Sequence, residues 1–187
     1  MPDHVLVVLD EAYFEYITDK NHSDSIPFLD KFPNAIVLRT FSKAYGLAAY
    51  RIGYGIGHSK VVTYLNTVRS PFNVTSLSLA IAEKALDDDE FVENCNLVNG
   101  KQKERFIEYA NENKLHLFES QANFVLIEVP GNSDEASEKL LQQGFIVRSG
   151  EALGTPGYVR VTIGTEDQNT GFFAAFDSLL TDAKLSL

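Results

Sequence analysis

The chain has 187 residues, of which 44% are hydrophobic and 22% are charged, a composition typical of a globular protein with its own core. Its formal net charge is −10 and its basic residues do not cluster, so it lacks the positive patch that binding to nucleic acid or an anionic membrane requires. Cys95 is the only cysteine, which excludes an internal disulfide, and the four histidines have no metal-ligand spacing. We therefore expect a cytoplasmic protein that binds no metal, nucleic acid or membrane.

The first half of the chain predicts an α/β arrangement. The apolar run at residues 5–9, which ends at Asp10, is typical of a strand buried on both faces of a parallel sheet. Because this strand starts so close to residue 1, we expect its sheet partners to lie upstream and the chain to be a fragment of a longer protein. The other predicted elements of this half are strands at residues 35–38 and 51–56 and helices at residues 60–69 and 75–86.

The second half predicts a smaller α+β region. An acidic run precedes a long apolar-faced helix near residues 90–112, where it complements the positive end of the helix dipole. We predict that this helix is the hinge between a large domain at residues 1–89 and a small domain at residues 90–187. The remaining elements are strands at residues 115–118, 124–129, 145–148 and 158–163, a helix at residues 134–143, and a last helix that begins with a Thr165–Gln168 capping box.

The polar connection after the second strand carries the residues with the clearest chemical potential. Lys43 lies in it after two hydroxyl residues, Thr40 and Ser42, and Arg51 begins the next strand. Hydroxyls and a guanidinium can hold a phosphate through charge-assisted hydrogen bonds. Asp10 ends a buried strand and needs a cation, because an isolated buried carboxylate is costly. A cofactor with a phosphate and a protonatable ring nitrogen suits both groups, which indicates pyridoxal phosphate bound to Lys43.

Each of these residues also has a purely structural interpretation. Lys43 can be an exposed loop lysine, Asp10 can cap a turn, and Arg51 can pair with surface carboxylates. The glycines of residues 53–57 match a dinucleotide-binding loop only loosely, and we interpret them as strand glycines beneath a closely packed group. The combination of residues, rather than any one of them, favours a cofactor site.

Three motifs of the sequence resemble those of the fold-type I pyridoxal-phosphate aminotransferases, and within them the histidinol-phosphate aminotransferases. They are LDEAY at residues 9–13, TFSKAYGLA at residues 40–48 and RIGY at residues 51–54. The runs FIVRSG at residues 145–150 and YVRVTIGT at residues 158–165 resemble the end of the same subfamily. The resemblance implies an α/β fold: part of the large domain, with a mostly parallel sheet and helices, followed by a smaller α+β domain.

The same resemblance implies roles for individual residues. Lys43 would form the internal aldimine with pyridoxal phosphate, Asp10 would pair with the pyridinium nitrogen, and Tyr13 would hydrogen-bond the ring hydroxyl. The cofactor phosphate would be held by Thr40, Ser42 and Arg51.

The resemblance also implies a reaction and its substrates. Arg148 and Arg160 would face the anionic group of the substrate, and Asn123 would lie near the site. The implied reaction is transamination of histidinol phosphate with 2-oxoglutarate, in histidine biosynthesis, by a homodimer.

The N-terminal half of such enzymes supplies a glycine-bearing phosphate loop, a residue stacked on the cofactor ring and an asparagine beside the ring hydroxyl, and these are not in this sequence. We therefore expect weak or absent catalysis from this chain alone. The alternatives are an aromatic or broad-specificity amino-acid aminotransferase, a decarboxylase of the same fold with a phosphate substrate, or a noncatalytic fragment that retains the fold.

Overall fold

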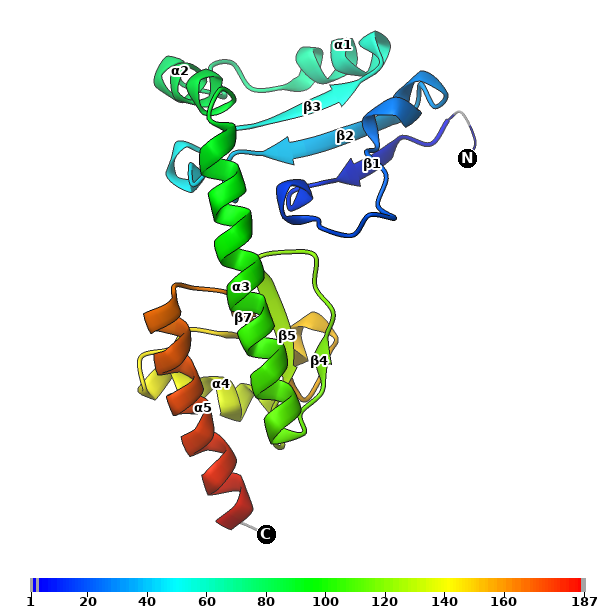
Figure 1. Cartoon of the computed structure of the whole chain (residues 1–187). Coiled ribbons are helices and arrows are strands. Elements are labelled where there is room, and N and C mark those ends of the chain that lie inside the picture. Colours follow the sequence, from blue (N-terminus) through cyan, green and yellow to red (C-terminus); the bar gives the residue numbers. More distant parts are fainter. Residues whose placement is uncertain (1, 3, 186–187) are drawn as a thin grey trace. The chain divides into compact units, whose positions relative to one another are not determined.

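The structure is a computed structural model that describes residue 2 and residues 4–185 (Figure 1). It divides into two compact units, Met1–Asn96 and Leu97–Leu187. The division falls inside helix α3 (Asp89–Asn113), the long helix expected near residues 90–112. The assignment of residues 1–89 and 90–187 to a large and a small domain remains a prediction.

The first unit contains a three-stranded sheet in the order β1 (Val7–Asp10), β2 (Ala35–Thr40), β3 (Gly53–Gly57). Strand β1 is parallel to β2, whereas β3 is antiparallel to β2. The sheet is therefore mixed within the described residues, which differs from the mostly parallel sheet expected. The β2–β3 connection holds only a single turn of 3₁₀-helix, η3 (Ala48–Tyr50), and a parallel partner would need a longer crossover.

Strand β1 differs from the strand that the sequence predicts. It begins at Val7 rather than Val5, and its side chains alternate in burial, with Val8 52% exposed. The expectation of a strand buried on both faces is wrong for the described chain, because the side chains on one face of β1 are exposed. The buried central strand is β2, in which Ile36 is 3% and Val37 0% exposed.

The glycines of β3 are explained by close backbone approach. A Cβ atom at Gly53 would lie 2.6 Å from the carbonyl oxygen of Arg39, and one at Gly55 would lie 3.1 Å from Cδ1 of Ile36. The interpretation of these residues as strand glycines under a packed group is confirmed.

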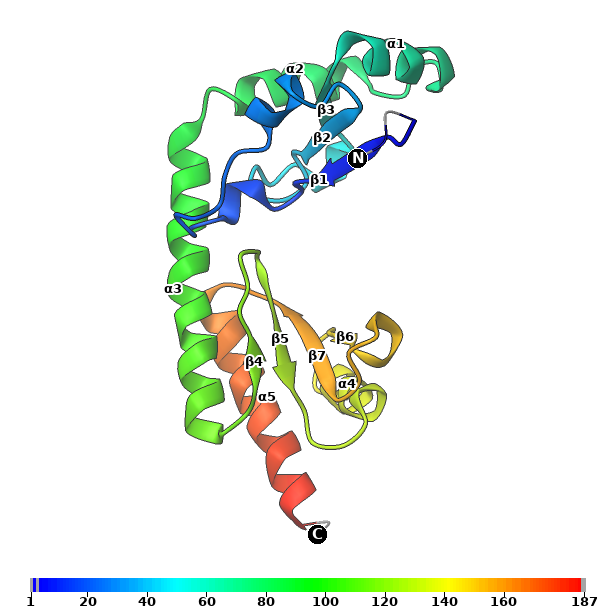
Figure 2. The same cartoon turned by 90° about the vertical axis from the view of Figure 1, so that its right-hand side faces the viewer.

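Two helices of this unit form at the positions expected and lie on one side of the sheet (Figures 1 and 2). Helix α1 (Ser59–Val68) lies beside β3 (Figure 1), and α2 (Ser76–Ala85) follows with Thr75 as its N-cap residue. Two further 3₁₀ turns, η1 (Phe14–Tyr16) and η2 (Ile26–Asp30), occupy the connection from β1 to β2. The buried cluster of this unit consists of Phe41, Ile52 and Ala82. Since Phe41 and Ile52 flank the β2–β3 connection, this cluster anchors the connection at both ends.

The second unit contains a four-stranded antiparallel sheet. Its order is β4 (Leu117–Phe118), β5 (Phe124–Glu128), β7 (Tyr158–Thr162), β6 (Arg148–Ser149). Helices α4 (Ser133–Gln142) and α5 (Glu166–Leu185) and the turn η4 (Glu151–Leu153) complete it. Helix α5 and the C-terminal part of α3 lie on the same side of the sheet (Figure 2). This is the α+β arrangement that the sequence predicts.

One core joins the sheet and helices of the second unit. Alternate residues of β5 and β7 are buried on the same face, and the helices contribute Phe106, Leu140 and Phe176, which are all 0% exposed. The predicted capping box of α5 is confirmed: the Thr165 N–H donates to Oε1 of Gln168 (2.9 Å), and the Gln168 N–H donates to Oγ1 of Thr165 (3.4 Å). Among the residues that the structure describes, no helix is long and apolar enough to cross a bilayer.

Candidate active site

A pocket of about 330 Å³ opens where β1 and β2 end. Because parallel strands end at the same edge of a sheet, the residues that follow β1 and β2 come together there. The pocket gathers five of the six residues predicted to hold a cofactor. Its lining consists of Asp10, Ala12, Leu38, Arg39, Thr40, Ser42, Lys43 and Arg51.

Lys43 stands on a short connection that is fixed at several points. The Gly46 N–H donates to the Lys43 carbonyl (2.9 Å), which closes a tight turn, and the Leu47 N–H donates to the Phe41 carbonyl (2.9 Å). Gly46 has a φ of +69°, a left-handed conformation that suits glycine. Ala44 is 1% exposed, so the residue next to Lys43 is buried. The lysine is therefore held at the pocket by a rigid segment.

Asp10, the last residue of β1, lines the same pocket. Its Oδ1 accepts a hydrogen bond from the Ala12 N–H (3.1 Å). Asp10 therefore caps a turn, as its structural interpretation predicts. The side chain is exposed, which corrects the expectation of a buried carboxylate, because the end of β1 borders the open pocket. Tyr13 follows in this turn, and Nζ of Lys43 lies 5.2 Å from the centroid of its ring.

Hydroxyl and guanidinium groups also line the pocket. Nη1 of Arg51 donates to Oγ of Ser42 (3.4 Å) and to the Ala48 carbonyl (2.8 Å), and the Ser42 N–H donates to Oγ1 of Thr40 (3.1 Å). Arg51 has a φ of +50°, an uncommon conformation for a residue with a side chain, of the kind that concentrates at functional sites. These donors form a set suited to a phosphate group.

Sequence reasoning missed Arg39, which lines the pocket and forms a buried ion pair. Its Nε and Nη2 donate to Oε2 of Glu11 (3.0 and 2.9 Å), and Nη2 also donates to Oδ1 of Asp24 (2.9 Å). Desolvation lowers the pKa of Arg39, but the hydrogen bond and negative charge of Glu11 outweigh it, so the pKa lies above its ordinary value. Only the register of β1 and β2, in which Asp10 lies opposite Leu38, reveals that Glu11 and Arg39 meet.

The second unit brings two predicted residues together. Arg148 of β6 and Arg160 of β7 are register partners, so their side chains leave the same face of the sheet. The guanidinium carbon of Arg160 lies 3.8 Å from the centroid of the Phe124 ring. Like charges directly opposite each other on neighbouring strands are destabilising by themselves. An anion between the two guanidinium groups would relieve this repulsion.

Glu151 directly follows β6 and is a carboxylate that could pair with one of these arginines. Its Oε1 instead accepts hydrogen bonds from the N–H and hydroxyl of Ser133 (3.3 and 3.1 Å) and from the Gly157 N–H (3.4 Å). Arg148 is exposed. Glu151 thus stabilises the loop that follows β6.

Asn123, the third predicted substrate residue, directly precedes β5. The loop before it is held by α3, where Nδ2 of Asn99 donates to the Ala122 carbonyl (3.2 Å) and Nζ of Lys103 donates to the Ser120 carbonyl (2.7 Å). Desolvation lowers the pKa of Lys103. The position of Asn123 is well defined, and its role remains a prediction.

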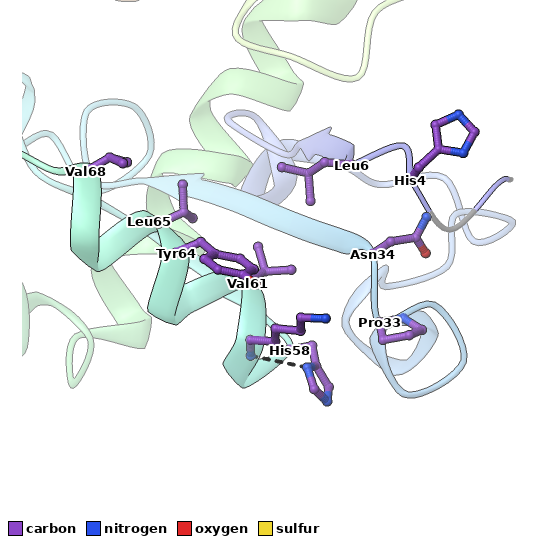
Figure 3. Close-up of a pocket in the computed structure, with 10 residues that line it drawn as sticks. His4, Leu6, Pro33, Asn34, His58, Val61, Tyr64, Leu65 and Val68 are labelled. Carbon is purple, nitrogen blue, oxygen red and sulfur yellow. Dashed lines mark hydrogen bonds between the residues drawn. The ribbon is translucent and has the colours of Figure 1, made fainter.

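A larger cavity, of about 650 Å³, lies between α1 and the start of β1 (Figure 3). Its lining includes the aliphatic side chains of Leu6, Val61 and Leu65, together with His4 and His58. Despite its size we place the candidate active site in the smaller pocket, since that pocket combines an amine, a carboxylate, hydroxyls and a guanidinium. Within residue 2 and residues 4–185, no group of three or more His, Cys, Asp or Glu side chains could hold a metal ion.

Comparison with known proteins gives the family. Residues 2–176 match the family described as "Aminotransferase class I and II". The chain belongs to this aminotransferase family. The resemblance found in the motifs is thereby confirmed, and the pocket around Lys43 is the pocket of an aminotransferase-family chain.

The relatives of this aminotransferase chain are similar over almost its whole length. Histidinol-phosphate aminotransferase of Lysinibacillus sphaericus (strain C3-41) is 48% identical over 182 residues, which are 97% of this chain and 50% of that protein. The enzyme of the same name from Bacillus subtilis (strain 168) is 44% identical over 180 residues, 96% of this chain and 50% of that protein. The chain spans about half the length of the curated relatives it matches.

A solved structure has the same fold. The crystal structure of histidinol-phosphate aminotransferase from Sinorhizobium meliloti in complex with pyridoxal-5'-phosphate superimposes with a TM-score of 0.86. Its sequence is 27% identical, and the match covers 97% of this chain and 50% of that chain. The described chain therefore has the fold of about half of an α/β fold-type I aminotransferase.

Proposed function

We propose that this chain forms the pyridoxal-phosphate-binding part of a histidinol-phosphate aminotransferase and supplies the lysine that reacts with the cofactor. The observation that carries the proposal is the lining of one pocket by Lys43, Asp10 and three phosphate-binding candidates. The donor set fits the cofactor, since an amine matches an aldehyde, a carboxylate matches a pyridinium, and hydroxyls with a guanidinium match a phosphate. The three candidates are Thr40, Ser42 and Arg51.

Each side chain has one task in this proposal. When bound, the cofactor supplies a ring that takes up the electrons released at the substrate carbon. Asp10 keeps the ring nitrogen protonated, which makes that uptake favourable. Lys43 would hold the cofactor through its amine, and that amine, once free, would act as general base and general acid for a 1,3-proton shift that starts at the substrate carbon bearing the amino group. Tyr13 donates to the ring hydroxyl.

The proposed substrates are an amine that carries a phosphate, histidinol phosphate, and an oxo acid, 2-oxoglutarate. The cross-strand pair of Arg148 and Arg160 supports an anionic substrate, because both guanidinium groups can donate to one phosphate or carboxylate. The names of the relatives favour histidinol phosphate. The proposal extends to Asn123 as a residue near the substrate, and to a cytoplasmic homodimer of histidine biosynthesis.

The test replaces the matched half of the Lysinibacillus relative with this chain, because the chain spans about half of that protein. With pyridoxal phosphate, the chimera should transfer the amino group of histidinol phosphate to 2-oxoglutarate. Lys43→Ala should abolish transfer, and Lys60→Ala, in the exposed first turn of α1, is the matched control. A chimera that folds but transfers no amino group, or that keeps its rate without Lys43, contradicts the proposal. Faster turnover of phenylalanine or tyrosine than of histidinol phosphate would favour an aromatic aminotransferase.

A further inference from the structure

A cluster of four side chains beside the pocket has no task in the proposed reaction. Arg39 is its centre, and we call it the Arg39 cluster, consisting of Arg39, Glu11, Asp24 and Phe14. The guanidinium donates to both carboxylates, and its carbon lies 3.6 Å from the centroid of the Phe14 ring. This one arginine therefore contacts three other side chains of the cluster.

The cluster contacts the turn that follows β1. This turn carries Asp10 and Tyr13, the two residues proposed to contact the cofactor ring. Glu11 directly follows Asp10, and Phe14 directly follows Tyr13. The Phe14 N–H also donates to the Glu11 carbonyl (3.0 Å), which makes the segment a compact turn. Arg39 therefore binds both residues that adjoin Asp10 and Tyr13.

Burial makes the Arg39–Glu11 contact the dominant one. The side chains of Arg39 and Glu11 are 11% and 8% exposed, whereas that of Asp24 is 45% exposed. Both Arg39 donors go to Oε2 of Glu11, while Oε1 is buried without a hydrogen-bond partner among the described residues. Removal of one partner of such a pair leaves a buried charge, which costs far more than loss of an exposed pair.

We propose that Arg39 and Glu11 are positioning residues, which hold the turn from Asp10 to Tyr13 in place at the pocket that Lys43 also lines. The proposal rests on the proposed function, in which Asp10 and Tyr13 contact the cofactor ring. In this proposal Arg39 acts through Glu11 and the turn. Two of its guanidinium nitrogens, Nε and Nη2, already donate to Glu11, and Nη2 also donates to Asp24. Arg39 lies in β2 and Lys43 follows the end of this strand, so the cluster links the turn after β1 to the strand that leads to Lys43.

The first experiment needs no cofactor and measures amide hydrogen exchange in the full chain. Glu11→Gln and Arg39→Met should speed exchange in residues 11–16 by about tenfold or more, because the buried pair that holds the turn is lost. Exchange at Val37, in the centre of β2, should change by less than about twofold. Asp24→Asn is the matched control and should have little effect on either segment. Unchanged exchange in residues 11–16, or an equal increase in β2, would overturn the proposal.

The second experiment asks whether the cluster acts through Asp10. Full chain is incubated with pyridoxal phosphate and borohydride, and the fraction of Lys43 that carries the reduced cofactor is measured by peptide mass spectrometry. Glu11→Gln should lower this fraction about tenfold in the wild-type background but less than about twofold in an Asp10→Asn background, because the two changes remove the same contact. Arg39→Lys, which keeps the positive charge, should lower the labelled fraction less than Arg39→Met does. Independent, multiplicative effects of Glu11→Gln and Asp10→Asn would overturn the positioning role.

The two experiments distinguish failure of the proposed cofactor site from failure of the proposed positioning role. If Lys43 is never labelled in the wild-type chain, the proposed cofactor site is wrong, and hydrogen exchange alone decides whether Arg39 holds the turn. If Lys43 is labelled equally in wild type and Glu11→Gln, the cofactor site stands and the positioning role is contradicted.

Discussion

The chemistry of the pocket depends on which functional groups its residues bring within reach of one another. Asp10, Ser42, Lys43 and Arg51 come from three separate stretches of the chain and line a single opening. None of them is unusual by itself, since each is a common surface residue type. Their combination provides an amine nucleophile, a fixed negative charge and a set of phosphate donors, which together match one cofactor.

Asp10→Ala tests the negative charge at the residue scale. In the chimera with the Lysinibacillus relative, kcat should fall by about 10²–10⁴, because the charge proposed to keep the ring nitrogen protonated is lost. The melting temperature should change by less than about 3 °C, since Asp10 is exposed. The matched control is Asp30→Ala, which removes another exposed aspartate. Full activity of the Asp10 variant would rule out its electronic role.

Glu15 provides a pH-dependent prediction in the same region. Burial raises its pKa above the ordinary value of 4.5, the charge of nearby Glu11 raises it further, and a backbone hydrogen bond and Arg39 oppose the shift. The folded state therefore holds this proton more tightly than the unfolded state, so its stabilising contribution is complete below about pH 4.5 and is lost as pH rises through the folded pKa.

Glu15→Gln removes this dependence because glutamine does not titrate. The melting temperature of the variant, relative to wild type, should rise as the pH is increased from about 4.5. Thermal unfolding of both proteins across this range is the measurement. A difference that stays constant or shrinks with increasing pH would show that burial does not raise the Glu15 pKa.

At the scale of elements, glycine has different consequences in a strand and in a helix. Gly53 of β3 faces the Arg39 carbonyl, 2.6 Å from where a Cβ would lie, whereas a Cβ at Gly100, inside α3, would meet nothing within 4 Å. Gly100→Ala should raise the free energy of unfolding by about 0.5–1 kcal/mol, and Gly53→Ala should lower it by more than about 1 kcal/mol. Denaturant unfolding measures both, and the opposite order of stability would contradict the packing described for β3.

Local signals predicted most elements of the chain. The capping box at Thr165 and the apolar periodicity of α3 depend on residues close together in the sequence, so the sequence alone predicts them. The exposure of Val8 and the antiparallel β3 depend on which strands are neighbours, which periodicity does not encode. The Arg39–Glu11 pair was missed for the same reason, because it depends on the register of β1 against β2. Lys43 and Arg51, which belong to neighbouring motifs, line one pocket, and their roles there remain predictions.

At the scale of the whole molecule, the proposed cofactor site and the proposed substrate arginines belong to different compact units. The first unit holds the Lys43 pocket, and the second holds the cross-strand pair of Arg148 and Arg160. Each unit has its own buried cluster. Cofactor binding and substrate binding should therefore respond to separate substitutions.

Arg148→Gln tests this separation. In the chimera it should raise the KM for histidinol phosphate by about 10–100-fold, because a charge-assisted hydrogen bond to the substrate is lost. Labelling of Lys43 by the cofactor should be unchanged. Arg69→Gln, at the exposed C-terminal end of α1, is the control. A KM that does not change would remove Arg148 from the substrate site.

The most direct test of the central claim is the position of the cofactor label. The full chain is incubated with pyridoxal phosphate, reduced with borohydride, digested and analysed by mass spectrometry. We predict that the reduced cofactor is attached mainly to Lys43, with little on exposed lysines such as Lys60 and Lys84, and that Lys43→Ala removes it. Labelling spread evenly over the exposed lysines, or concentrated at a lysine other than Lys43, would contradict the account.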